Sequence, residues 1–181
     1  MNGLIYLFTM QSLIDKYRST FDFNEIHKTT INASPETCYK AAMELDLSDS
    51  FIISFLFWLR GIPFQSTVFK GFVEGMKFTL LEESHWNEFV YGFQKKEKIE
   101  WIENKEEFCE DSSAYDLKAA WNLKFTEIPN GCEVSTETRV KCLTRKSKIF
   151  FSVYWFFIRP FSGLIRLEML RLLRKKVGSD R

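Results

Sequence analysis

The chain has 181 residues, 45% of them hydrophobic and 17% aromatic, which predicts one folded domain with a sizeable core. Its four Cys form no CxxC pair and have no neighbouring His, which argues against a metal site and a Cys/His nucleophile pair. The formal net charge is +1, yet residues 144–181 carry ten basic side chains and two acidic ones. We therefore expect no metal, no cofactor and a basic surface near the C-terminal end.

The first 20 residues are predicted to form a leader or a short helix. Residues 3–10 are apolar but lack the positive n-region and the small-residue cleavage site of a signal peptide. Residues 10–18 have the pattern of a short amphipathic helix. We expect residues 1–20 to precede a single domain at residues 21–177, with a disordered tail at residues 178–181. Scattered thiols without an export signal predict a reduced, cytoplasmic protein.

A strand and two short helices are predicted next. Residues 23–31 alternate and are rich in Thr and Ile, which is typical of a strand. Ser34 is suited to cap a helix over residues 35–45, because Pro35 fits the first helical position. A second helix is predicted over residues 50–60, with an almost wholly apolar centre.

The middle of the chain is predicted to be a series of strands. Residues 76–81 and 88–94 alternate with a period of two, and both segments place aromatic side chains on one face. Residues 95–111 are more highly charged, so we expect them to pair weakly at an edge of the sheet.

The strongest hairpin signal lies in residues 117–143, where two alternating segments flank a Pro-Asn-Gly turn. The returning strand has apolar and Thr side chains on one face and charges on the other. Thr136 and Thr138 are thus predicted to point inward, where they could give an apolar cavity its few hydrogen-bonding groups. Ordinary β-propensity explains Thr in a strand equally well. On the outer face, Glu137 and Arg139 are predicted to form a solvated pair.

One long helical pattern runs from Thr144 to Lys176, beginning at a capping region and ending among basic residues. Its first half, residues 149–158, leaves almost no polar face and is therefore predicted to be covered on nearly all sides. At about ten apolar residues, this segment is shorter than the roughly 20 needed to span a bilayer. Pro160 predicts either a bend or a break in the helix.

The second half of this helix has an apolar side and a basic side. Arg166 falls on the apolar side, and a buried guanidinium needs a partner. We predict that Arg166 pairs with an acid or a carbonyl, or meets the polar end of a ligand. The alternative is that its stem packs while its head reaches solvent. Taken from Thr144 onward, the basic C-terminal helix is predicted to present a solvated face or to make a peripheral contact with anionic lipid headgroups, and no nucleic acid is expected.

Several short motifs along the chain resemble those of a known superfamily. They are Leu45-Asp46-Leu47-Ser48, Leu56-Phe57-Trp58-Leu59-Arg60-Gly61-Ile62-Pro63, Ala119-Ala120-Trp121-Asn122, Ser135-Thr136-Glu137-Thr138-Arg139-Val140 with Tyr154-Trp155, and Ile158-Arg159-Pro160-Phe161-Ser162-Gly163-Leu164-Ile165-Arg166 leading into Glu168 and Leu170-Arg171. With the order of elements, residues 23–176 resemble the helix-grip superfamily, which includes START lipid-transfer domains, birch-pollen-allergen-like proteins and polyketide cyclase-like proteins. The resemblance is closest to a bacterial branch with no established activity.

This resemblance implies an α+β helix-grip fold. A curved antiparallel sheet of about six or seven strands would wrap around the long C-terminal helix, with two short helices after the first strand. In such proteins the pocket lies between the long helix and the concave sheet. The residues placed near it are Trp121, Leu123, Phe125, Thr136, Thr138, Tyr154, Phe157 and Arg166. A different rotation of the helix would bring its neighbouring side chains there instead.

We predict that the protein binds or carries a small hydrophobic ligand, such as a lipid, an isoprenoid or an aromatic metabolite, without catalysis. The alternative is a polyketide cyclase/dehydratase-like enzyme, which needs a titratable group inside the pocket. The candidates for such a group are Arg166, Glu137, Tyr154 and His27, and none has a partner at diagnostic spacing. A second alternative is a membrane or protein interaction module that admits no ligand.

Overall fold

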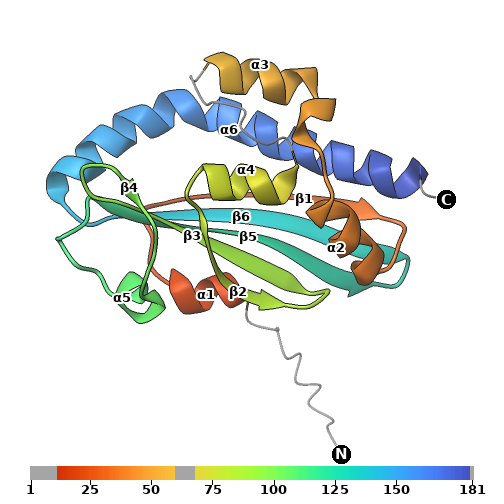
Figure 1. Cartoon of the computed structure of the whole chain (residues 1–181), viewed down its shortest axis with the longest axis horizontal. Coiled ribbons are helices and arrows are strands. Elements are labelled where there is room, and N and C mark those ends of the chain that lie inside the picture. Colours follow the sequence, from red (N-terminus) through yellow and green to blue (C-terminus); the bar gives the residue numbers. More distant parts are fainter. Residues whose placement is uncertain (1–11, 60–67, 180–181) are drawn as a thin grey trace, which may run out of the picture.

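A sheet with helices on both faces organises the chain (Figure 1). The computed structural model describes residues 12–59 and 68–179. The strands are β1 (Phe23–Ile31), β2 (Thr79–Ser84), β3 (Glu88–Lys95), β4 (Ile99–Glu100), β5 (Leu117–Ile128) and β6 (Gly131–Cys142). The helices are α1 (Leu13–Tyr17), α2 (Pro35–Met43), α3 (Phe51–Leu59), α4 (Phe69–Gly75), α5 (Lys105–Cys109) and α6 (Arg145–Ser179), with a single 3-10 turn, η1 (Leu47–Asp49).

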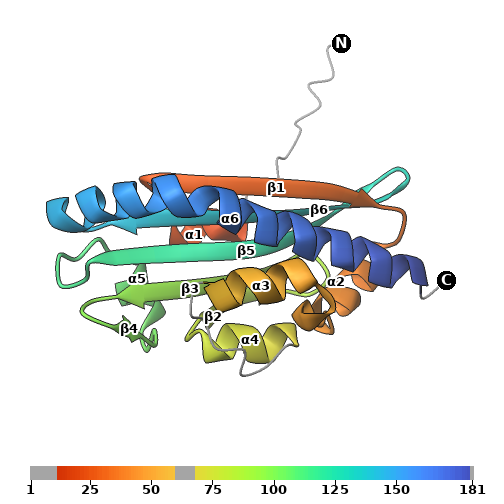
Figure 2. The same cartoon turned by 90° about the horizontal axis from the view of Figure 1, so that it is seen from above.

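The sheet is six-stranded and antiparallel, in the order β1-β6-β5-β3-β2, with β4 paired to β3. Figure 2 shows α6 lying along one face of the sheet, with α3 beside it and α4 near the β2 edge. The helices α1 and α5 lie on the other face (Figure 1). The predicted α+β fold is therefore confirmed, with its curved sheet, its long C-terminal helix and its short helices after the first strand.

The predicted helix starts are confirmed by their caps. The Ser34 hydroxyl accepts a hydrogen bond from the Thr37 amide at 3.2 Å, and proline occupies the first position of α2. At the start of α6, the amide of Ser147 donates to the hydroxyl of Thr144 at 3.0 Å. The helix then continues through Pro160 without a break. Each side-chain oxygen satisfies a backbone donor that has no partner inside the helix.

The predicted hairpin forms from β5 and β6, and its register places Leu117 opposite Cys142 and Ile128 opposite Gly131. At the turn, Gly131 has a φ of +136°, and a Cβ there would collide with the carbonyl oxygen of Ile31. Only glycine tolerates both conditions. The predicted inward face of β6 is also confirmed, because Thr136 and Thr138 are buried.

Residues 95–111 do not form the predicted edge pairing along their length. Two residues pair as β4, and the segment then turns into the helix α5. The Asn104 side chain caps this helix by accepting hydrogen bonds from the amides of Glu106 and Glu107, at 2.9 and 3.2 Å. Phe108, which is fully buried, anchors α5 to the sheet. The capping residue and the single apolar anchor favour a helical turn over an extended strand.

The face of the sheet opposite α6 is covered rather than solvated. Ile14 of α1 and Phe108 of α5 form a second apolar cluster there with Val90. Beside this cluster, the Arg139 guanidinium lies 2.6 Å from the Glu137 carboxylate, as expected for a pair. The prediction that this pair is solvated was wrong, because both side chains are nearly buried beneath the N-terminal helix.

The first half of α6 is exposed, so the prediction that it is covered on nearly all sides was also wrong. Phe150, Phe156 and Phe157 are between 66 and 76% exposed. Only one side of the helix faces the sheet here. On that side, the ring centroids of Phe151 and Trp155 lie 5.1 and 6.0 Å from the ring centroid of Phe23. Within the described residues, no second layer covers the opposite side. An apolar sequence pattern therefore did not ensure burial.

Candidate hydrophobic ligand site

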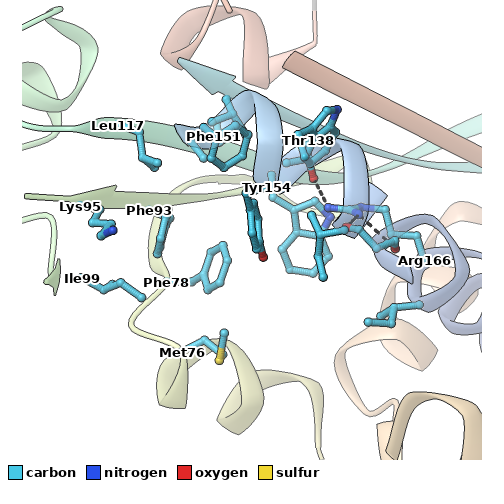
Figure 3. Close-up of a pocket in the computed structure, with 18 of the residues that line it drawn as sticks. Met76, Phe78, Phe93, Lys95, Ile99, Leu117, Thr138, Phe151, Tyr154 and Arg166 are labelled. Carbon is cyan, nitrogen blue, oxygen red and sulfur yellow. Dashed lines mark hydrogen bonds between the residues drawn. The ribbon is translucent and has the colours of Figure 1, made fainter. Parts of the chain in front are cut away.

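A cavity of about 800 Å³ lies between the first half of α6 and the sheet, closed on a third side by α4 and the residues that follow it (Figure 3). Strand β5 contributes Ala119 and Trp121 to the floor, and Phe93 adds to it from β3. Ala119 lies opposite Phe93 and Val140 in the sheet, and its small side chain occupies little of the space above this part of the floor.

The walls of the cavity are mainly aromatic and aliphatic. The roof includes four large apolar side chains of α6, and the wall opposite comes from α4 and from the segment that leads into β2 (Figure 3). The roof residues are Phe151, Tyr154, Trp155 and Ile158, and the wall residues are Phe72, Met76 and Phe78. Ligand pockets commonly have such an apolar lining with a few polar groups, which fix the orientation of the ligand.

The sheet beneath the second half of α6 has no comparable space. Tyr39 of α2 inserts its ring there, and its ring centroid lies 5.4 Å from that of Phe125 and 5.9 Å from that of Phe89. Leu123 and Phe125 are 2% exposed within this filled core. The helix α2 thus fills one end of the space between α6 and the sheet, and the other end remains open as the cavity.

Arg166 is the main polar group at the inner end of the cavity. Its guanidinium donates to the Thr138 hydroxyl at 2.6 Å (Figure 3) and to the Ser162 carbonyl at 3.2 Å. It also lies 3.5 Å from the carboxylate of Glu25. The prediction that Arg166 pairs with an acid is confirmed, and the alternative of a head extended into solvent is not observed. Charge-assisted bonds to fixed partners hold this cation in place against the cavity.

The charged side chains that line the cavity are mostly basic. Lys95, Lys146 and Arg166 contribute three cations, and Asp116 contributes one carboxylate. Lys146 is exposed, whereas the side chain of Arg166 is 15% exposed. An attraction between opposite charges is stronger where water is excluded. The lining therefore favours a ligand with a negative or hydrogen-bond-accepting group.

The structure brings four of the eight predicted site residues to the cavity, and these are Trp121, Thr138, Tyr154 and Arg166. Leu123 and Phe125 lie in the filled core instead. Phe157 lies outside the cavity, and its neighbours on the helix face the sheet in its place. The rotation of a helix that is apolar on all sides cannot be deduced from its sequence.

Thr136, also predicted at the site, lies outside the cavity lining and has a structural role. Its hydroxyl accepts a hydrogen bond from the indole nitrogen of Trp121 at 2.6 Å and donates one to the Asn122 carbonyl at 2.9 Å. These two bonds fix the indole that forms part of the cavity floor. The wall formed by α4 was not predicted from the sequence. Buried Phe69 and Val73, four residues apart, are the helical signal that could have indicated it.

The titratable candidates for catalysis are not gathered in the cavity. His27 hydrogen-bonds Glu25 at 3.0 Å, but it lies in a shallow groove between β1 and Pro160 of α6. Glu137 lies on the opposite face of the sheet. Across residues 12–59 and 68–179, no group of three or more His, Cys, Asp or Glu side chains could hold a metal ion.

Solved structures with a similar course of the chain are known, although no protein-family model and no curated protein matches the sequence. An uncharacterised protein from Rhizobium leguminosarum is 8% identical, with a TM-score of 0.43 over 87% of this chain and 95% of that one. A protein from Mesorhizobium loti is 11% identical, with a TM-score of 0.41 over 88% and 99% of the two chains.

A third similar structure is the di-domain ARO/CYC protein BexL from the BE-7585A biosynthetic pathway. It is 13% identical, with a TM-score of 0.42 over 86% of this chain and 50% of that one. At such low identities and TM-scores, these likenesses support no conclusion about function, since one fold serves many activities.

Proposed function

We propose that the protein binds a small hydrophobic molecule with one acidic group, in the cavity beneath the first half of α6. The observation that carries this proposal is the cavity itself, about 800 Å³ in volume and lined mainly by aromatic and aliphatic side chains. Pockets for small molecules typically have volumes of about 300 to 1,000 Å³. A fatty acid, an isoprenoid acid or an aromatic acid would suit this size and lining.

The acidic group of the ligand is assigned to the inner end of the cavity. Arg166 is held there by Thr138 and Glu25, so it needs little rearrangement to receive a carboxylate. Its paired Glu25 carboxylate reduces the positive charge, but the exposed Lys146 and the half-buried Lys95 add to it at the rim. An ordered guanidinium loses less entropy on binding than a mobile lysine does.

No arrangement in the cavity favours the enzymatic alternative. Of the titratable candidates from the sequence, Tyr154 and Arg166 line the cavity, whereas His27 and Glu137 lie outside it. General acid or base catalysis requires a group within hydrogen-bonding reach of the reacting atoms. Binding without chemistry needs only the apolar cavity and its polar end, so we do not propose a reaction.

Two measurements test the proposal. Native mass spectrometry of the purified protein should reveal a co-purified hydrophobic molecule, which denaturation would release. Titration with cis-parinaric acid should quench tryptophan emission, because Trp121 and Trp155 line the cavity. The methyl ester of the same probe should bind at least about tenfold more weakly, since it cannot form a charged contact with Arg166.

A pair of matched variants locates the acidic end. Arg166→Met combined with Glu25→Gln removes both charges of the buried pair, so that no single charge is left behind. This double variant should bind the acid and the ester equally. Lys95→Met with Lys146→Met, at the rim, should keep the preference for the acid. The proposal fails if the wild-type protein binds neither probe.

A further inference from the structure

An apolar surface extends over α3 and the outer side of the first half of α6. Its main side chains are Phe51, Phe55, Trp58, Phe150, Phe156 and Phe157, which are between 45 and 83% exposed. We call this surface the aromatic face. The two helices lie side by side in both views (Figures 1 and 2). The Ser50 hydroxyl, directly before α3, donates to Glu168 in the second half of α6 at 2.7 Å, which ties the start of α3 to that part of the long helix.

The aromatic face is unusual for a protein that remains free in water. Exposed apolar residues are normal when scattered, but contiguous patches larger than a few hundred Å² usually mark a contact surface. Rings lie beside one another here without entering a core. The ring centroids are 6.2 Å apart for Phe51 and Phe55, and 6.0 Å apart for Phe55 and Trp58. Bulky aromatic side chains are also frequent where a protein meets the headgroup region of a lipid bilayer.

Within α3 and residues 145–167 of α6, the charged side chains are all basic, and the exposed Asp49 before α3 is an acid at the edge of the face. Residues 145–167 include five basic side chains and no acidic one, and residues 51–59 of α3 carry no charge. Lys148 is paired with Asp22 at 2.6 Å, whereas Arg145, Lys146 and Arg159 are exposed around the rings. Two copies of this face would bring like charges together, which is unfavourable. A surface of anionic lipids is complementary to it.

Two basic side chains near the C-terminal end of α6 contact the body of the protein. Arg174 donates to the Thr30 carbonyl at 3.0 Å, and Lys176 donates to the Glu44 carbonyl at 2.8 Å. Both side chains are thereby bound to the body of the protein. The face that combines free apolar side chains with positive charge is at the other end of the helix.

We propose that the protein docks on anionic membranes through the aromatic face, with α3 and the first half of α6 lying in the plane of the headgroups. Among the described residues, no helix is long and apolar enough to cross a bilayer, so the contact is peripheral. The proposal does not depend on ligand binding. Phe150 and Tyr154, however, belong both to this exposed side and to the cavity lining, so the docked surface borders the cavity.

Vesicle co-sedimentation of the full chain tests the proposal. The protein should bind phosphatidylcholine vesicles that contain phosphatidylglycerol, bind pure phosphatidylcholine more weakly, and lose part of its binding at high salt. Phe156→Ser with Phe157→Ser should lower the partition coefficient at least about tenfold, because two inserted rings are lost. Ile26→Ser is the matched control, since Ile26 is 54% exposed on the opposite face of the sheet, and it should change binding by less than about twofold.

The outcomes distinguish membrane docking from dimerisation through the same face. A wild-type chain that ignores anionic vesicles would overturn the proposal, as would equal losses in the Ile26 control. Light scattering that shows a dimer, dissociated by the Phe156 and Phe157 changes, would assign the face to a second copy instead. Neither ring lines the cavity, so this variant should bind cis-parinaric acid in solution as the wild type does. A failure of docking is thereby distinguished from a failure of ligand binding.

Discussion

The two halves of α6 are both rich in apolar side chains but have opposite surroundings. In the second half, Met169, Leu170, Leu172, Leu173 and Val177 are buried in the main core. In the first half, Phe150, Phe156 and Phe157 are mostly exposed, and the side chains that do face the sheet border a cavity. The helix α2 makes the difference by inserting Tyr39 at one end and not at the other. Burial is thus decided by the opposing layer rather than by the helix alone.

The largest expected effect comes from removing a side chain in the filled half. Leu173 is 1% exposed, so Leu173→Ala should lower the free energy of unfolding by about 2 to 5 kcal/mol, through lost contacts and an added cavity. Phe157→Ala, in the exposed half, should change it by no more than about 0.5 kcal/mol. Urea unfolding of both variants measures the two values. Similar losses in the two variants would mean that the halves do not differ as described.

The glycines of α6 provide a second, smaller contrast. A Cβ at Gly163 would lie 2.6 Å from the Glu25 carboxylate and 3.3 Å from the His27 ring, whereas a Cβ at Gly178 meets nothing within 4 Å. Gly163→Ala should therefore displace Glu25 from Arg166 and destabilise the protein by about 1 to 3 kcal/mol. Gly178→Ala should be neutral or stabilise it by up to about 1 kcal/mol, because alanine is a better helix former.

Thermal unfolding of the two glycine variants shows directly whether each substitution raises or lowers the stability of the protein. Stabilisation by Gly163→Ala would show that the Glu25 carboxylate moves aside at little cost. Such a result would also remove the structural basis for the arginine–glutamate pair at the inner end of the cavity.

The smallest effect concerns the pH dependence of the contact between α3 and α6. Hydrogen bonds from Arg171 and Ser50 hold the pKa of the Glu168 carboxyl below its ordinary value of 4.5, although burial opposes them. The ionised group therefore stabilises the folded state above pH 4.5, and this contribution is lost as the pH falls through the lowered pKa. Glu168→Gln should flatten the loss of stability in that acidic range. Identical acid unfolding curves for the variant and the wild type would contradict this assignment.

Much of the fold could be predicted because its local signals agree with each other. The Pro-Asn-Gly turn, the alternation in β6 and the caps at Ser34 and Thr144 each depend on a few neighbouring residues. Arg166 could be expected to find an acid because a buried charge requires one, although only the structure identifies Glu25. Signals of this kind do not depend on the rest of the molecule.

The candidate site was harder to predict because it depends on how distant segments pack. Phe157 was placed at the cavity because an all-apolar helix gives no indication of its rotation. Leu123 and Phe125 were placed there because nothing in the sequence shows that Tyr39 fills that end of the space. The α4 wall was missed because its helical pattern is short, and the exposure of the aromatic face could not be deduced from its composition.

The most direct test of the proposed ligand site is a titration of Ala119→Phe with cis-parinaric acid. Ala119 forms part of the cavity floor, and a phenyl ring there would occupy the space assigned to the ligand. The variant should keep its urea unfolding midpoint and bind the probe at least about tenfold more weakly than the wild type. Unchanged affinity in a folded variant would contradict the account, because the probe would then be bound somewhere other than beneath the first half of α6.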